Sequence, residues 1–124
     1  MKNNITLTIL IFLFKLNCYS QENKLNFDLS TSTKSFEILC SLLNSKDTIN
    51  LKKVVTKECY KSFNLNNLNG LQDLAKDWKG KKTKTTKSTD TEEILKIETY
   101  YIPLRFIKEP ESKDWKFSTF VLKP

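Results

Sequence analysis

The chain has 124 residues, with 21 basic and 14 acidic side chains and no histidine, so its formal net charge is +7. This length accommodates one domain. The absence of histidine excludes Ser-His-Asp triads, Cys-His dyads and histidine-ligated zinc or haem. The two glycines are too few for a glycine-rich phosphate loop, and no CxxC pair is present. The composition therefore removes the commonest catalytic and cofactor classes.

The first twenty residues have the order of a secretory signal peptide. Lys2 supplies a positive charge, residues 5–14 form an apolar run, and Ser20 places a small side chain before Gln21. This run is too short to span a bilayer, which needs about 20 residues. We therefore expect residues 1–20 to be a signal peptide and the mature protein to be periplasmic or secreted. A buried N-terminal helix is the alternative.

The three cysteines bear on the compartment and on covalent chemistry. Cys18 raises the alternative of lipid anchoring, although Lys15 and Asn17 do not match the positions that a bacterial lipobox requires. If Cys18 leaves with the signal peptide, Cys40 and Cys59 remain in an oxidising compartment and could form a disulfide. Two small, buried apolar side chains are the other interpretation. No histidine is available to activate either thiol for catalysis.

The mature chain opens with a polar segment and a helix. Residues 21–34 are rich in Asn, Ser and Thr, and we expect them to form a flexible leader. A single domain then occupies residues 35–124. Its first helix should end at Asn44-Ser45, and its apolar side chains recur at i, i+3, i+4 and i+7. These are Phe36, Leu39, Cys40 and Leu43.

Two further helices are predicted after this one. Asp47 or Thr48 can cap the second helix, and Thr56 can restart it. Residues 64–70 are rich in Asn and end in Gly, and we expect a loop there because both residue types favour turns. A third helix should follow over residues 71–79.

Strand patterns begin after Gly80, which stands where a glycine commonly ends a helix. Residues 81–88 are mainly Lys and Thr, as expected of an edge strand. Residues 94–107 are apolar, aromatic and β-branched, and their apolar parity changes near residues 100–103. We interpret this change as a bulge or a bend within one long strand.

The last strand follows a hairpin connection. Residues 108–114 form the connection, and apolar side chains alternate along residues 115–122. The sequence thus predicts three helices followed by two or three antiparallel strands. Helices segregated before strands indicate an α+β domain.

Two short phrases add to this layout. Residues 43–47 (LNSKD) look like an interhelical turn, and residues 114–117 (DWKF) open the final strand. Together with the element order over residues 35–123, they resemble the NTF2-like superfamily. The resemblance implies N-terminal helices packed on a curved antiparallel β-meander, in the broader cystatin-like arrangement, with a pocket between them. It also implies a small exported bacterial member and a homodimer through the outer face of the sheet.

Some relatives within this superfamily resemble ketosteroid isomerase and use an Asp base with a Tyr or Asp donor in the pocket. No motif places such a set on this chain, so no catalytic residue, cofactor or metal ligand is assigned. Asp73 and Asp77 stand at i and i+4 and could hold a metal. Exposed pairing with neighbouring lysines explains them better.

A basic run is the most prominent charge feature of the sequence. Such a run could bind an anionic glycan or lipid headgroup. Nucleic acid is disfavoured, because the run has neither arginine forks nor stacking aromatic side chains. The alternative is a solvated edge strand whose lysines block edge-to-edge pairing. The residues are Lys79, Lys81, Lys82, Lys84 and Lys87.

Arg105 is the only arginine of the chain. Its planar guanidinium could bind a carboxylate ligand in the pocket, or it could pair with a buried Glu or Asp. Aromatic side chains could line the same pocket, although they also suffice for a core. The pocket candidates are Arg105, Tyr101, Trp78, Phe63 and Trp115.

These observations predict an exported, non-catalytic domain that binds a small apolar ligand or a protein partner. One alternative is an NTF2-like enzyme with an Asp/Tyr proton-transfer site. Another is a basic protein that binds an anionic surface or acts as an inhibitor-type partner.

Overall fold

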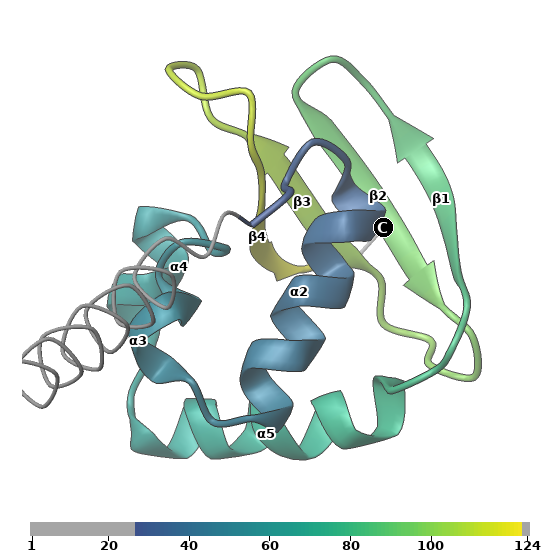
Figure 1. Ribbon diagram of the computed structural model, residues 1–124. Helices are drawn as coiled ribbons and strands as arrows, with labels where there is room; N and C mark the ends of the chain where they lie inside the picture. Colours follow the sequence, from purple (N-terminus) through teal and green to yellow (C-terminus); the bar gives the residue numbers. More distant parts are fainter. Residues whose placement is uncertain (1–26, 123–124) are drawn as a thin grey trace, which may run out of the picture.

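The computed structural model describes residues 27–122, in which helices precede an antiparallel sheet (Figure 1). The predicted α+β class is confirmed. Residues 1–20, predicted as a signal peptide, lie outside the described part. In chain order the elements are α2 (Ser32–Asn44), α3 (Thr48–Leu51), α4 (Lys57–Ser62), α5 (Leu65–Trp78), β1 (Thr83–Ser88), β2 (Glu92–Ile97), β3 (Leu104–Lys108) and β4 (Trp115–Phe120).

Helix ends follow the local chemistry of the sequence. The Asp47 side chain caps α3 and the Thr56 side chain caps α4, each by accepting a hydrogen bond from the N–H three residues on. Both caps confirm the predicted starting points. The first helix ends at Asn44, as predicted. Gly80 has a φ of 77°, the left-handed conformation that a C′ glycine supplies after a helix.

The segment predicted as a loop over residues 64–70 is instead the start of α5. The side chain of Asn64 accepts a hydrogen bond from the N–H of Asn67 at 2.9 Å and caps the helix. Leu68 and Leu71 then pack on the core. The loop prediction was wrong because it weighed the turn preference of asparagine above the capping function of the same side chain.

The sheet has four strands in the order β1-β2-β3-β4, each antiparallel to the next, rather than two or three. The long strand predicted over residues 94–107 is two strands, because the chain reverses at residues 98–103. Leu95 pairs with Leu104, so β2 and β3 present apolar side chains to the same face. The change of parity therefore marks a hairpin and not a bulge or bend.

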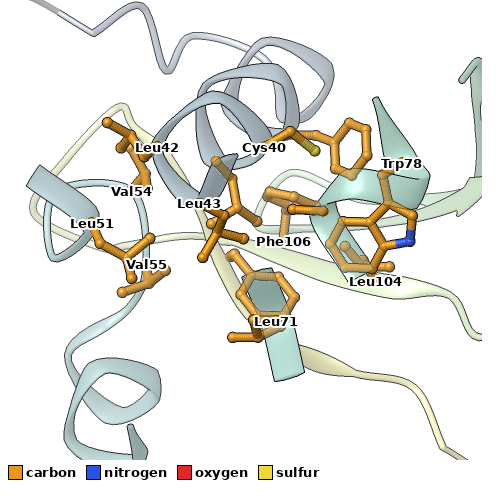
Figure 2. Packing of buried hydrophobic residues seen from close by; sticks show 14 of the residues in the cluster. Cys40, Leu42, Leu43, Leu51, Val54, Val55, Leu71, Trp78, Leu104 and Phe106 are labelled. Carbon is orange, nitrogen blue, oxygen red and sulfur yellow. The ribbon is translucent and has the colours of Figure 1, made fainter. Parts of the chain in front are cut away.

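One face of the sheet packs against α2 and α5, and side chains from α2, α5 and β3 meet in the core (Figure 2). Trp78, at the end of α5, is 1% exposed. Its ring centroid lies 5.8 Å from that of Phe36 and 5.5 Å from that of Tyr100. Aromatic pairs at these separations add to the stabilisation that burial of apolar area provides.

The last strand, β4, is held by the N-terminal half of the chain as well as by β3. Val55 forms a parallel bridge with Phe117. The N–H of Trp115 donates to the carbonyl oxygen of Leu29 at 2.8 Å, and Leu29 is buried. Part of the segment 21–34, expected as a leader, therefore contacts the sheet.

Candidate functional site

A cleft of about 530 Å³ lies between α4, α5 and the end of β4. Sites for small molecules commonly enclose about 300–1,000 Å³. Apolar side chains from all three parts line it: Cys59, Phe63, Leu71, Leu74, Phe117 and Phe120. Gly70 and the polar side chains Ser62, Asn67, Ser118 and Thr119 complete the lining. We call this site the α4–α5–β4 cleft.

The cleft is open because the segment that pairs with the outer edge of β4 ends part-way along this strand. Val55 bridges β4 at Phe117, on the side away from β3. Phe117 and Thr119 are opposite consecutive residues of β3, so Ser118 has no residue opposite. A bulge of this kind bends the strand that carries it. Residues 118–120 therefore form one wall of the cleft, and α5 forms another.

Gly70 faces this cleft from within α5. A Cβ built on Gly70 would have no heavy atom within 4 Å, so the packing of the chain does not require a glycine there. Its backbone does not require one either, because its φ lies outside the left-handed region. The other glycine, Gly80, is explained by its positive φ. Gly70 thus lines the cleft at a position where neither packing nor backbone conformation requires a glycine.

The chemistry of the cleft is that of a neutral apolar site. Its lining includes no Asp, Glu, Lys, Arg or Tyr. Cys59 is the one titratable group in the lining, and burial raises the pKa of its thiol to about 11. A neutral thiol at physiological pH is a poor nucleophile. The arrangement can hold an apolar molecule, and it offers no acid–base pair of the kind that proton transfer needs.

A second hollow of about 600 Å³ lies between α2 and the end of α5. Phe36, Cys40 and Trp78 form its apolar part. Its lining also carries the charged side chains of Glu37, Lys79 and Lys81, together with several neutral polar residues. This hollow therefore carries charged side chains, which the lining of the α4–α5–β4 cleft lacks.

The five pocket candidates from the sequence are not brought together. Phe63 lines the α4–α5–β4 cleft. Trp78 and Trp115 are buried members of the core. Tyr101 lies in the loop between β2 and β3 and is 84% exposed. Arg105 alternates with buried core residues of β3, so its side chain lies on the outer face of the sheet.

Arg105 is paired within the chain. Its Nε lies 3.3 Å from Oε2 of Glu92, and Nζ of Lys87 lies 3.0 Å from Oε1 of the same carboxylate. The hydrogen bond from Lys87 is the main cause of the lowered pKa of Glu92, with smaller contributions from the charges of Lys87 and Arg105. Arg105 thus pairs within the chain, but its partner is a partly exposed carboxylate rather than the buried one that was the second alternative. Dimerisation through this charged outer face stays a prediction.

The lysines of the predicted anionic-surface site differ in their surroundings. Lys87 is paired with a carboxylate, as described above. Lys81 donates a hydrogen bond to a threonine in the loop between β2 and β3. Lys79 follows the last residue of α5. Lys82 and Lys84 line a shallow hollow of about 310 Å³ at one end of the sheet. The basic run thus contributes two side chains to this hollow, and Lys79 and Lys81 to the hollow between α2 and α5.

Lys96, which was not among the predicted site residues, joins Lys82 and Lys84 in this hollow. It lies on β2 directly opposite Lys84 on β1. Its place depends on the register of two strands, which the sequence interpretation did not assign. If the hairpin between β1 and β2 had been recognised in the sequence, Lys96 would have been placed beside the basic run.

The two cysteines of the described chain are free and buried. Burial is the main cause that raises the pKa of Cys40 to about 12. Cys59 lines the α4–α5–β4 cleft, whereas Cys40 lines the hollow between α2 and α5. The interpretation as small, buried apolar side chains fits these positions, and the possible disulfide is not formed. Cys18 lies outside the described residues.

Within residues 27–122, no group of three or more His, Cys, Asp or Glu side chains could hold a metal ion. The helices of this part of the chain all lack the length and apolar character needed to cross a membrane. The superfamily resemblance stays a prediction. Comparison of the chain with protein-family models, curated proteins and solved structures found no match.

Proposed function

We propose that the protein binds a small apolar molecule in the α4–α5–β4 cleft. Gly70 is the observation that carries this proposal. A glycine in a helix interior lowers helix stability by about 1 kcal/mol relative to alanine. Because nothing lies within 4 Å of a Cβ at this position, the packed chain gains nothing from its absence. An occupant of the cleft would gain the space.

The lining favours an apolar occupant with few polar groups. The rings of Phe63, Phe117 and Phe120 offer flat apolar surface. The amide of Asn67 is already engaged, because its Nδ2 donates to the carbonyl oxygen of Ser62 at 2.7 Å. The hydroxyl of Ser118 makes no hydrogen bond within residues 27–122, so it can orient one polar group of the ligand. Burial of apolar area would supply most of the affinity.

We further propose that this binding occurs outside the cytoplasm. The order of charge, apolar run and small residue over residues 1–20 supports export. Removal of that segment would leave every residue of the cleft in the mature chain. The protein would then act as a carrier or receptor for an apolar molecule in the periplasm or outside the cell.

The cleft is tested by filling it from α5. Gly70→Phe places a ring in the open space without backbone strain, because the glycine is helical. We expect this variant to bind the neutral fluorescent probe N-phenyl-1-naphthylamine at least tenfold more weakly than the wild type. Gly70→Ala adds one methyl group and should stay within threefold of the wild-type affinity.

Asn69→Phe is the matched control, since residue 69 is exposed on the same helix and does not line the cleft. It should bind the probe as the wild type does, and near-ultraviolet circular dichroism should show all variants folded. Equal probe affinity in Gly70→Phe and the wild type would place the bound probe elsewhere and reject the proposal. So would the absence of probe binding by the wild type.

A further inference from the structure

Exposed apolar side chains gather at the end of the sheet that holds the loop between β2 and β3. Tyr101 in this loop is 84% exposed. The N–H of Val121 donates to the carbonyl oxygen of Pro103 at 2.9 Å, which brings the chain after β4 to the same loop. Leu122, the next residue, is 78% exposed. An aromatic and an aliphatic side chain thus face solvent at one end of the sheet.

The hollow lined by three lysines lies at this same end. Lys82, Lys84 and Lys96 line it together with Thr99 of the loop. The N–H of Glu98 donates to the carbonyl oxygen of Lys82 at 2.9 Å, which joins β1 to the base of the loop. The three lysines form no ion pair with any other residue of 27–122. Glu98 is the one acidic residue in the lining, so the hollow has a formal charge of +2 from three lysines and one glutamate.

This arrangement is unfavourable for the folded chain by itself. Lys84 lies directly opposite Lys96, and like charges at opposed positions of two strands repel. Thr99 has a φ of 65°, a left-handed conformation that a β-branched residue rarely adopts. Backbone strain of this kind clusters at functional sites. A partner with negative charge would relieve the repulsion.

We propose that this end of the sheet docks on an anionic lipid surface. Lys82, Lys84 and Lys96 contact lipid phosphates, and Tyr101 and Leu122 enter the interface between headgroups and acyl chains. Basic side chains near an anionic leaflet and tyrosine at the headgroup level are the two features by which peripheral proteins hold to membranes. This surface is independent of the α4–α5–β4 cleft, and its test does not depend on a ligand there.

A lipid surface fits these residues better than another polyanion. Nucleic acid recognition uses arginine forks, and Arg105 is paired with Glu92 on the sheet. Stacked bases need several exposed aromatic rings, whereas Tyr101 is the one large aromatic side chain exposed in this loop. A sulfated glycan would use the lysines and would leave Leu122 without a role. The exposed leucine therefore distinguishes the lipid surface from soluble polyanions.

The proposal is tested by sedimentation of the full chain with phosphatidylcholine vesicles that contain 0 or roughly 30% phosphatidylglycerol, enough to give the anionic surface on which basic residues act. All variants share the apolar segment 5–14, so differences between them report on the described surface. We expect Lys82→Gln/Lys84→Gln/Lys96→Gln to lower partition onto the anionic vesicles at least tenfold. Tyr101→Ala/Leu122→Ala should lower it at least threefold and leave retention on heparin unchanged.

Lys52→Gln/Lys57→Gln/Lys61→Gln is the control, because it removes the same charge from α4 and from the residue that follows α3. It should change partition less than twofold. An equal loss in this control would mean that total charge drives binding, and would overturn the proposal. Heparin or DNA binding that depends on the three lysines, with vesicle binding insensitive to Tyr101→Ala/Leu122→Ala, would assign the surface to a soluble polyanion instead.

Discussion

The hydroxyl of Ser35 on α2 donates a hydrogen bond to the carbonyl oxygen of Trp115 on β4, with 2.6 Å between the two oxygens. The side chain of Ser35 is fully buried. Within residues 27–122, this is the one buried side-chain hydrogen bond between a helix and the sheet. The bond connects residues that are 80 positions apart in the sequence. It therefore fixes the position of α2 along the last strand.

We expect Ser35→Ala to lower the free energy of unfolding by about 1–3 kcal/mol, because the carbonyl oxygen of Trp115 would lose its partner in a buried place. Urea denaturation followed by tryptophan fluorescence measures the change. Ser41→Ala, on an exposed position of the same helix, should stay within about 0.5 kcal/mol of the wild type. Equal effects of the two substitutions would contradict the structural role of the Ser35 hydroxyl.

The two glycines should respond to alanine in opposite directions. Gly70→Ala should raise the free energy of unfolding by about 0.5–1 kcal/mol, because the site is helical and open. Gly80→Ala should lower it by about 1 kcal/mol, because a φ of 77° is unfavourable for a residue with a Cβ. Chemical denaturation of both variants checks the pair, and changes of the same sign would refute this account.

Acid stability should depend on Asp28. Hydrogen bonds from Ser30 and Lys34 lower the pKa of its carboxyl from 3.8 to about 2, the side chain of Ser30 being the larger cause. A lowered pKa stabilises the folded chain above the unfolded value, and the contribution is lost as the pH falls through the folded value. The wild type should therefore be more stable than Asp28→Asn above pH 4, and this advantage should disappear between pH 4 and about 2.

Thermal unfolding midpoints of the two proteins from pH 6 to pH 2 give the comparison. Asp73→Asn is a suitable control, because Asp73 is exposed and its contact with Lys76 at 3.8 Å is long. An advantage of the wild type over Asp28→Asn that stays constant down to pH 2 would be inconsistent with the lowered pKa of Asp28.

The buried thiols should be unreactive in the folded protein. With Cys18→Ser removing the third cysteine, we expect Cys40 and Cys59 to react slowly with Ellman's reagent at pH 8, because burial raises both pKa values well above that pH. Unfolding in guanidinium without a reductant should release two thiols per chain. Release of no thiols under those conditions would show a disulfide between them.

The sequence was most informative where one residue decides the local backbone. Asp47 and Thr56 cap helices because their side-chain oxygens can reach an N–H three residues ahead, and this requires no distant partner. The edge strand β1 follows from the same local chemistry, since lysine and threonine tolerate exposure on both faces. Asn64 shows the limit of this approach, because asparagine both caps helices and forms turns.

The candidate site could not be predicted to the same extent, because it depends on pairings between distant residues. The cleft needs the bulge at Ser118 and the approach of α5, and neither has a local signal. The hollow lined by Lys82, Lys84 and Lys96 depends on the register in which β1 pairs with β2. The hairpin at residues 98–103 was misinterpreted because a reversal and a bend both change the parity of apolar positions.

The backbone hydrogen bonds that join β4 to Leu29, Val54 and Thr56 also set the order in which the domain can form. A chain that emerges from its N-terminus, whether from a ribosome or through a translocation pore, releases its helices long before the strand that covers them. Until residues 115–117 have emerged, Leu29, Val54 and Thr56 have no strand to pair with. The domain therefore completes its fold only after β4 has emerged, and until then its helices and its first three strands form an unfinished core.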